Sequence, residues 1–306
     1  MRSSHVGSYP LEHSQDNMLR AYLDTVSSGI SVPPIPQLKS FTEIYLDPLA
    51  SSGKLRKVKE DRYEALNLDE PVIDLGEVES FLERSKADPR GLRLPVTGPL
   101  TLASKVGGEG FMDSMITNKD AVFSFFVPYV RKIVDWASHR GIGYVFVDEP
   151  ALGLIVGRKI LSYSERELIE IYEEIFGEAK SYTGMHVCGR ISPLLSDILM
   201  RVPAKYLSHE FHDTRENMKS FSREKLEEYD KIISPGVVSA KNPEVESAEE
   251  VSSLLREILE RFGPRVDLVS ADCGFGGLKG LRNSYDISLR KLKLIAEVSS
   301  SLLKSS

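Results

Sequence analysis

Short apolar segments alternate along the chain with longer amphipathic ones, a pattern typical of repeated βα units. Eight of the short segments predict strands, and these are Ser4–Tyr9, Ile30–Pro34, Leu92–Thr97, Tyr144–Val147, Gly184–Cys188, Tyr206–Glu210, Lys231–Val238 and Val266–Ala271. The longer segments have apolar residues at helical spacing and predict helices at Gln15–Ser28, Asn118–Arg140, Ser164–Ser181, Ser247–Arg261 and Ser284–Leu303. Ser164 and Glu167 also have the spacing of a capping box. The order of these elements predicts an α/β fold.

Eight parallel strands can close into a barrel or form an open, doubly wound sheet. Neither a GxGxxG nor a GxxxxGK[ST] motif follows any predicted strand, which argues against the nucleotide-binding open sheet. The 306 residues suit one (β/α)8 TIM barrel, and no linker divides them. We therefore predict a single domain over residues 1–306. Residues 35–90 are less regular, with charge runs around Lys54–Arg62, and this stretch is interpreted as a solvated helix and an excursion over the barrel.

Composition narrows the possible functions. The formal net charge of −6 argues against binding to nucleic acid or to an anionic membrane. No apolar stretch reaches the roughly 18 residues that span a bilayer, and the chain starts without an apolar leader. We therefore expect a cytoplasmic protein. The two cysteines are too few for a disulfide framework, so they are either inert core residues or thiolate ligands.

Four residues at the ends of the later strands have the chemistry of metal ligands. His186 and Cys188 are two apart on one strand, so their side chains point to the same side. Glu210 ends the next strand, and Cys273 follows the last one. Barrel enzymes place their active sites at this C-terminal edge. One histidine, two cysteines and a glutamate suit zinc, although each residue alone is more often a packing residue.

Three further motifs accompany these residues: His-Val-Gly-Ser-Tyr-Pro at 5–10, Leu-Pro-Val-Thr-Gly-Pro-Leu-Thr at 94–101 and Val-Asp-Glu-Pro-Ala-Leu at 147–152. The His-x-Cys motif, the glutamate 22 residues after its cysteine and the distal Asp-Cys-Gly stand in the same order and near the same spacing. Together they resemble the catalytic, C-terminal half of cobalamin-independent methionine synthase over essentially the whole chain.

The resemblance implies a zinc-dependent methyltransferase that acts on the thiol of L-homocysteine. His186, Cys188, Glu210 and Cys273 would hold the zinc, with Glu210 the ligand that loosens most readily. In the family the ammonium group of homocysteine binds to the residue matched by Asp148, and its carboxylate binds partly to backbone near Gly7 and Ser8. Gln37 is the nearest counterpart of a family glutamate that binds the amine. A helix cap at Asp148 and an ordinary turn at Gly7 and Ser8 are the alternatives.

The departures from the family concern the methyl donor. The N-terminal half of the long enzymes has no counterpart, so we expect a free-standing barrel similar to the short archaeal-type relatives. The tryptophan that stacks on folate is missing, since the single tryptophan is Trp136 in a predicted helix, and Gly153-Leu154 replaces an acid. Lys241 replaces the histidine that is the family's general acid. These changes favour a methylcorrinoid donor, methylcobalamin or a methylcorrinoid protein, although a lysine with a shifted pKa could still act as the acid.

Four alternatives remain open. The methyl donor could be a methyl-tetrahydropterin. The acceptor could be another thiol such as coenzyme M, but coenzyme M has no ammonium group for Asp148 to bind. A relative of uroporphyrinogen decarboxylase would give Cys188 and Cys273 no role. A protein without enzyme activity, a zinc-binding partner that docks to a corrinoid protein, would have a closed site with four ligands.

Overall fold

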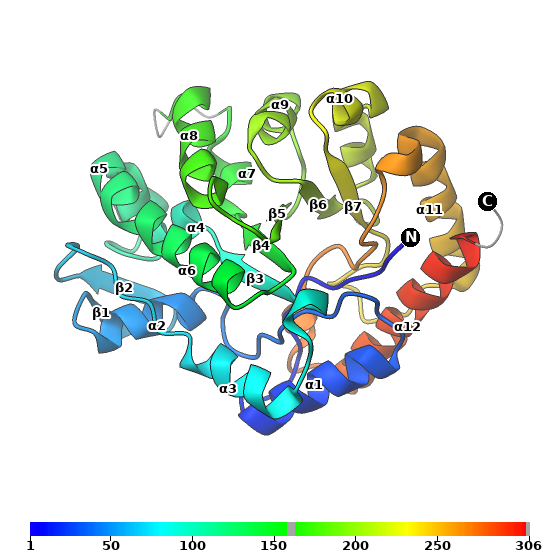
Figure 1. The fold of residues 1–306 in the computed structure, drawn as a ribbon, viewed down its shortest axis with the longest axis horizontal. Coiled ribbons are helices and arrows are strands. Elements are labelled where there is room, and N and C mark those ends of the chain that lie inside the picture. The colour runs from blue at the N-terminus through cyan, green and yellow to red at the C-terminus, as the bar shows by residue number, and fades with distance from the viewer. Residues whose placement is uncertain (158–162, 304–306) are drawn as a thin grey trace.

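Five parallel strands form the regular part of the sheet in the computed structural model, which describes residues 1–157 and 163–303. Their order in the sheet follows the chain: β3 Arg93–Thr97, β4 Tyr144–Asp148, β5 Tyr182–Val187, β6 Tyr206–Glu210 and β7 Ile232–Gly236. Nearly every residue of these strands is buried, as expected for parallel strands that are covered on both faces. Figure 1 shows them surrounded by helices.

Single bridges between the remaining predicted strands close the sheet into a barrel. Ser3 pairs with Val269, Ser4 with Val32, Pro34 with Arg93, and Gly236 with Ser270. All eight predicted strand segments therefore lie side by side in a closed ring, and the predicted (β/α)8 TIM barrel is confirmed. Two prolines at positions 33 and 34 explain why the second segment forms no regular ladder, because proline has no backbone N–H to donate.

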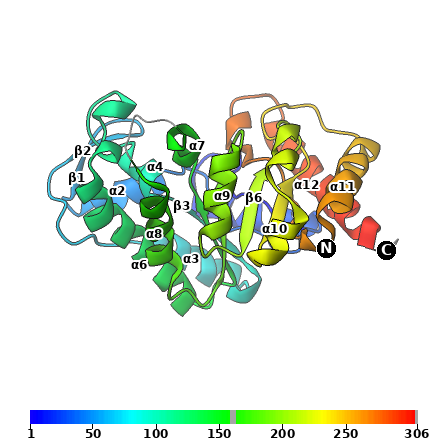
Figure 2. The ribbon, with the colours of Figure 1, turned by 90° about the horizontal axis from the view of Figure 1, so that it is seen from above.

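Helices cover the outside of the barrel (Figures 1 and 2). They are α1 Gln15–Ser27, α2 Glu43–Ser51, α3 Gly76–Ser85, α4 Pro99–Ala103, α5 Lys119–Ala121, α6 Val127–His139, α7 Ala151–Ile155, α8 Glu165–Phe176, α9 Pro193–Arg201, α10 Arg223–Glu228, α11 Ala248–Phe262 and α12 Ser284–Leu303. The predicted capping box at the start of α8 is present. The predicted helix Asn118–Arg140 consists of α5, a π-helical turn and α6.

Within the stretch 35–90, for which the sequence indicates a solvated helix and an excursion, the charge run Lys54–Arg62 is not helical. This segment forms most of an antiparallel hairpin of β1 Leu55–Lys59 and β2 Arg62–Ala65, next to α2. The hairpin turns at Asp61, whose φ is +57°. Four of the five residues of β1 are exposed, and charged side chains pair across the strands, as Arg56 does with Glu64. A run of charges on exposed strands therefore resembles a solvated helix in sequence.

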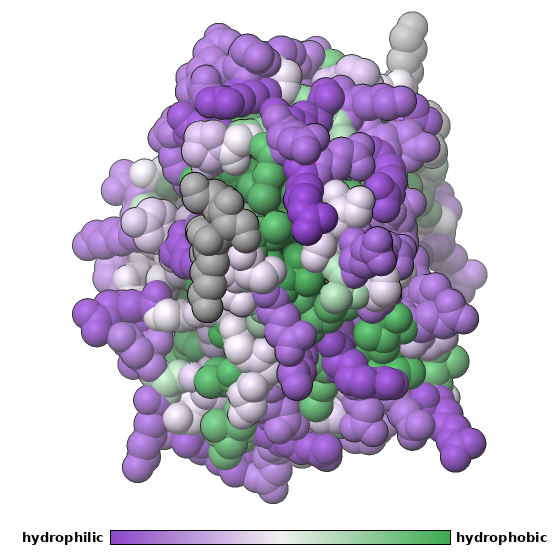
Figure 3. All heavy atoms as spheres, turned by 90° about the vertical axis from the view of Figure 1, so that its right-hand side faces the viewer, coloured by the Kyte–Doolittle hydropathy of each residue, from purple (hydrophilic) through white to green (hydrophobic). Residues whose placement is uncertain are grey.

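The surface carries scattered apolar groups. On the face shown in Figure 3, polar side chains cover most of the area and apolar side chains gather in a band between them. No helix in the described ranges has both the length and the apolar character needed to cross a bilayer.

Candidate functional site

Three of the four predicted metal ligands gather at the C-terminal edge of the barrel. The Cys188 sulfur lies 3.0 Å from Nε2 of His186 and 3.3 Å from the Cys273 sulfur. All three donor atoms lie within 4.8 Å of one another. Nδ1 of His186 lies 3.2 Å from the hydroxyl of Ser208, which orients the buried ring. The strand order thus brings together residues that are 85 positions apart in sequence.

The three donor atoms fit a zinc ion. Tetrahedral zinc with bonds of about 2.3 Å to thiolate would separate the two sulfurs by about 3.8 Å. The sulfurs are 3.3 Å apart, so they would have to separate by only about 0.5 Å. The hydrogen bond between the thiols lowers the pKa of Cys273 well below its usual range and raises the pKa of Cys188. One thiol of the pair is therefore already disposed to be a thiolate, the form that binds metals.

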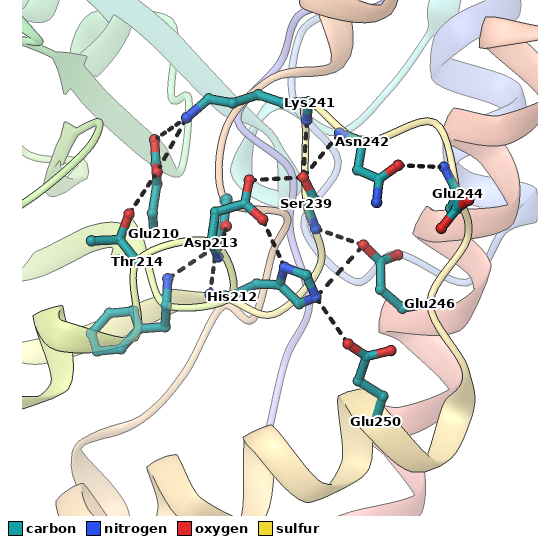
Figure 4. A network of polar contacts seen from close by, with 12 residues as sticks. Glu210, His212, Asp213, Thr214, Ser239, Lys241, Asn242, Glu244, Glu246 and Glu250 are labelled. Carbon is teal, nitrogen blue, oxygen red and sulfur yellow. Dashed lines mark hydrogen bonds and ion pairs between the residues drawn. The ribbon is translucent and has the colours of Figure 1, made fainter.

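Glu210 lies outside this group of donor atoms. Its buried carboxylate accepts a hydrogen bond from the Thr214 hydroxyl at 3.2 Å and contacts Nζ of Lys241 at 3.4 Å through both oxygens (Figure 4). Partial burial lowers the pKa of Lys241, but the Glu210 carboxylate outweighs this effect and the pKa is raised. The structure thus brings two predicted site residues together as an ion pair beside the cysteines.

A hydrogen-bond network fixes the loop that carries Lys241 (Figure 4). The Ser239 hydroxyl donates to the Asp213 carboxylate at 2.7 Å and accepts from the backbone N–H groups of Lys241 and Asn242. The backbone N–H of Ser239 donates to Glu246 at 2.8 Å. The loop after β7 is therefore tied to the loop after β6, the strand that ends in Glu210.

Two further buried residues support the ligands, and sequence reasoning assigned neither of them a role. Asn217 accepts from the N–H of Ile191 and donates to the carbonyls of Gly189 and Glu210, which joins the loop after Cys188 to β6. Asp272 accepts three backbone N–H groups of the segment that follows Glu210, from Phe211, His212 and Asp213. No pattern in the sequence marks Asn217, whereas Asp272 could have been noticed as part of the Asp-Cys-Gly motif.

Asp148 ends β4 and is paired in register with His186 on β5. The alternative of a helix cap is not observed, because α7 begins after Pro150 without a side-chain cap in the described structure. Burial raises the pKa of Asp148 to about 6. Its Oδ1 has no hydrogen-bond partner among the described residues, and Nη2 of Arg93 lies 4.0 Å away. Asp148 therefore presents a carboxylate close to the proposed metal ligands, and no described residue donates a hydrogen bond to its Oδ1.

Glu149, the next residue of the motif, has a structural position. Its buried carboxylate accepts hydrogen bonds from the N–H of Leu100 at 3.1 Å, the N–H of Thr101 at 2.7 Å and the Tyr172 hydroxyl at 3.1 Å, and also from the Thr101 hydroxyl. It therefore satisfies the first N–H groups of α4, and burial raises its pKa to about 7. These contacts join the Asp-Glu-Pro segment to the Thr-Gly-Pro segment.

The first two strand ends bring Gly7, Ser8 and Gln37 together. The N–H of Gln37 donates to the carbonyl of Gly7 at 2.9 Å, and Ser8 bridges to Gln37. The Ser8 hydroxyl accepts from the N–H of Gly276 at 3.1 Å, in the segment after Cys273. Gly7 has φ of +134°, and a Cβ there would lie 2.8 Å from the Pro95 ring. A glycine is required at this position, and Ser8 contacts the loop that carries a proposed ligand.

Comparison with known proteins relates the chain to one family. The family described as the catalytic domain of cobalamin-independent synthase matches residues 87–298. A methionine synthase of Pyrococcus horikoshii is 26% identical over 212 residues, which cover 68% of this chain and 57% of that protein. A methionine synthase of Saccharolobus islandicus is 26% identical over 60% of this chain and 51% of its own length. The chain therefore spans about half the length of these relatives.

Solved structures share the fold over the whole chain. A B12-independent methionine synthase from Shewanella, in complex with selenomethionine, superposes with a TM-score of 0.68 at 16% identity and covers 99% of both chains. A methyltransferase from Methanosarcina mazei superposes with a TM-score of 0.65 at 14% identity, over 99% of this chain and 94% of its own.

Proposed function

Because the chain belongs to the family of cobalamin-independent synthase catalytic domains, we propose that it transfers a methyl group to the thiol of L-homocysteine and so forms methionine. The observation that carries this proposal is the group of His186, Cys188 and Cys273, gathered at the barrel edge where Asp148 also ends its strand. The donor set suits a metal that activates a thiol, and the unused carboxylate suits a ligand with a positive charge.

In this proposal His186, Cys188 and Cys273 hold a zinc ion, with Glu210 as the fourth ligand. Bound zinc lowers the pKa of a substrate thiol and so supplies a thiolate at neutral pH. Ser208 keeps the imidazole of His186 in its orientation through a contact of 3.2 Å. Asn217 and Asp272 keep the three strand ends that carry the ligands in register.

The substrate's amino-acid end requires its own partners. We assign Asp148 to the ammonium group, and the backbone near Gly7 and Ser8, with Gln37 beside it, to the other end of the amino acid. Burial shields the carboxylate of Asp148 from water, so a contact with an ammonium group is stronger there than in bulk water. Acceptors without an ammonium group, coenzyme M among them, would leave Asp148 without a partner.

We propose a methylcorrinoid donor, either methylcobalamin or a methylcorrinoid protein. Lys241, which stands where the family has its acidic histidine, has a raised pKa because of Glu210, and such an ammonium is a poor proton donor at neutral pH. Trp136 packs against the hydrophobic core from α6, so its ring is engaged there. A methylfolate needs a proton on its leaving nitrogen, whereas cobalt(I) leaves a methylcorrinoid without one. Lys241 would then act on Glu210 instead of on the donor.

The test is formation of methionine from homocysteine by the zinc-loaded protein, with methylcobalamin and methyl-tetrahydrofolate compared in parallel. We expect methionine with methylcobalamin only, and a loss of at least about 100-fold in Cys273→Ala because a ligand is missing. Product from the folate would contradict the donor proposal, and methylation of coenzyme M in preference to homocysteine would contradict the acceptor. A protein that binds zinc but methylates neither thiol with either donor would support a docking role.

We also propose that residues 1–306 form one domain, with the segment 35–90 as part of it. The hairpin supports this, because the buried Tyr63 bridges to Val106 and its hydroxyl donates to Asp47 in α2. One cooperative unfolding transition, with equal midpoints by circular dichroism and by Trp136 fluorescence, is expected.

A further inference from the structure

A buried arginine lies inside the barrel beside Asp148. The side chain of Arg93 is fully buried, and its guanidinium carbon lies 3.8 Å from the centre of the Phe146 ring. None of its three side-chain nitrogens has a hydrogen-bond partner among the described residues. A guanidinium carries five N–H donors, and burying them without partners is costly. Such a side chain requires an explanation beyond packing.

The negative charge of Asp148 explains why Arg93 can be buried. The ion-pair partner of Arg93 in the described structure is Asp148, with Nη2 and Oδ1 4.0 Å apart. Oδ1 is buried as well and has no hydrogen bond to a described residue. Burial lowers the pKa of Arg93 to about 10, so the guanidinium is still charged at neutral pH. The two charges compensate each other inside the barrel, and Oδ1 is the oxygen turned toward Arg93.

The strand register builds this arrangement. Arg93 is paired with Tyr144 at the start of β4, and Phe146 and Asp148 follow at intervals of two, so they share one face of the strand. Phe146 is paired with Gly184 on β5, and a Cβ at Gly184 would clash with the Phe146 ring. The absence of a side chain at Gly184 thus leaves room for the Phe146 ring. The Arg93 guanidinium packs on this ring and faces the Asp148 carboxylate.

We propose that Arg93 is a positioning residue that holds the Asp148 carboxylate from inside the barrel, so that its other oxygen faces the ammonium group of the acceptor. This inference rests on the proposed function, because it assumes an amino acid in the site. Without the guanidinium, Asp148 would face an aromatic ring and have no opposite charge to fix its orientation. Arg93 would then determine selectivity for an amino-acid thiol over a thiol without an amine.

The test uses two acceptors that differ only in the amino group, homocysteine and 4-mercaptobutyrate, with the zinc-loaded protein and methylcobalamin. Arg93→Met is expected to lower kcat/KM for homocysteine by about 10- to 100-fold, mainly through KM, because an interaction with a charged group is lost. The value for 4-mercaptobutyrate and the affinity for zinc should change less than about twofold. Arg93→Lys, which keeps the charge, should recover part of the loss.

Lys231→Met is the matched control for removal of a buried cation. Lys231 is buried and directly precedes β7, and its ammonium group donates to the carbonyls of Val202 and Ala204. It therefore lies at the N-terminal end of the strands, whereas Glu210 lies at the C-terminal end of β6. Lys231→Met should leave the ratio between the two acceptors unchanged. Binding of homocysteine to the zinc-loaded proteins, measured by calorimetry, gives a readout independent of turnover and should weaken in Arg93→Met alone.

Two results overturn the inference while the proposed function stands. One is an equal loss for both acceptors in Arg93→Met, and the other is an unchanged KM for homocysteine. If Arg93→Met does not fold, Arg93→Lys decides. A loss in kcat/KM that is larger for homocysteine than for 4-mercaptobutyrate supports the inference, and an equal loss for both acceptors or no loss for either overturns it. A wild-type protein that neither binds nor methylates homocysteine refutes the proposed function, and the inference with it.

Discussion

Gly98→Ala tests whether the contact between the Thr-Gly-Pro segment before α4 and the Asp-Glu-Pro segment after β4 is as tight as the structure shows. Gly98 has φ of −72° and ψ of 158°, a conformation that alanine adopts freely, so backbone strain is not involved. A Cβ at this position would lie 2.5 Å from the carboxyl carbon of Glu149 and closer still to Oε2. Ordinary contact requires about 3.5 Å or more, so the carboxylate must move by about 1 Å.

The cost follows from the hydrogen bonds of Glu149. A shift of about 1 Å breaks the bonds from the N–H groups of Leu100 and Thr101, and each buried donor left unpaired costs about 1–3 kcal/mol. Replacing glycine by alanine restricts the unfolded chain and returns about 0.4–1 kcal/mol. We therefore expect Gly98→Ala to lower the free energy of unfolding by about 1–6 kcal/mol.

Urea denaturation followed by Trp136 fluorescence measures this change. Gly91→Ala is the control, because a Cβ there meets no atom within 4 Å, and its effect should stay within about 0.5 kcal/mol. In a Glu149→Ala background the same Gly98→Ala change should cost little, since the obstructing carboxylate is gone. A loss below about 1 kcal/mol in the wild-type background, or equal losses in both backgrounds, would refute the reasoning.

Three other outcomes are expected. Burial lowers the pKa of Lys231 to about 8, so above pH 8 the native state holds fewer protons than the unfolded state. The free energy of unfolding should therefore rise between about pH 8 and pH 10, by up to about 1.4 kcal/mol per pH unit, relative to that of Lys231→Met. Asn217→Leu, which leaves the carbonyls of Gly189 and Glu210 unpaired, should weaken zinc binding by about 10- to 100-fold in a chelator competition. Removing zinc with a chelator should lower the melting temperature of the wild type but not of Cys188→Ser/Cys273→Ser.

Much of this architecture could be predicted because it depends on local pattern. Buried strands at regular intervals gave the barrel, and the barrel in turn brings the C-terminal ends of strands together, so His186, Cys188 and Cys273 could be grouped before their distances were known. The hairpin of β1 and β2 was missed because most residues of β1 are exposed, so no apolar alternation marks it as a strand and not as a solvated helix.

Other features depend on contacts that sequence does not encode locally. The orientation of Glu210 toward Lys241 joins residues 31 positions apart, and the Arg93 guanidinium on β3 faces Asp148 at the end of the neighbouring strand β4. Asn217 joins two loops through backbone carbonyls, which any sequence provides. Such positions become visible only once the strands are in register, because their partners are determined by the fold and not by residue type.

The measurement that tests the central claim most directly is zinc X-ray absorption of the loaded protein before and after homocysteine is added. The account predicts two sulfur ligands, those of Cys188 and Cys273, each at about 2.3 Å from the zinc ion, and a third sulfur ligand once homocysteine is present. A sulfur count that stays the same at saturating homocysteine, or zinc bound without sulfur, would contradict it.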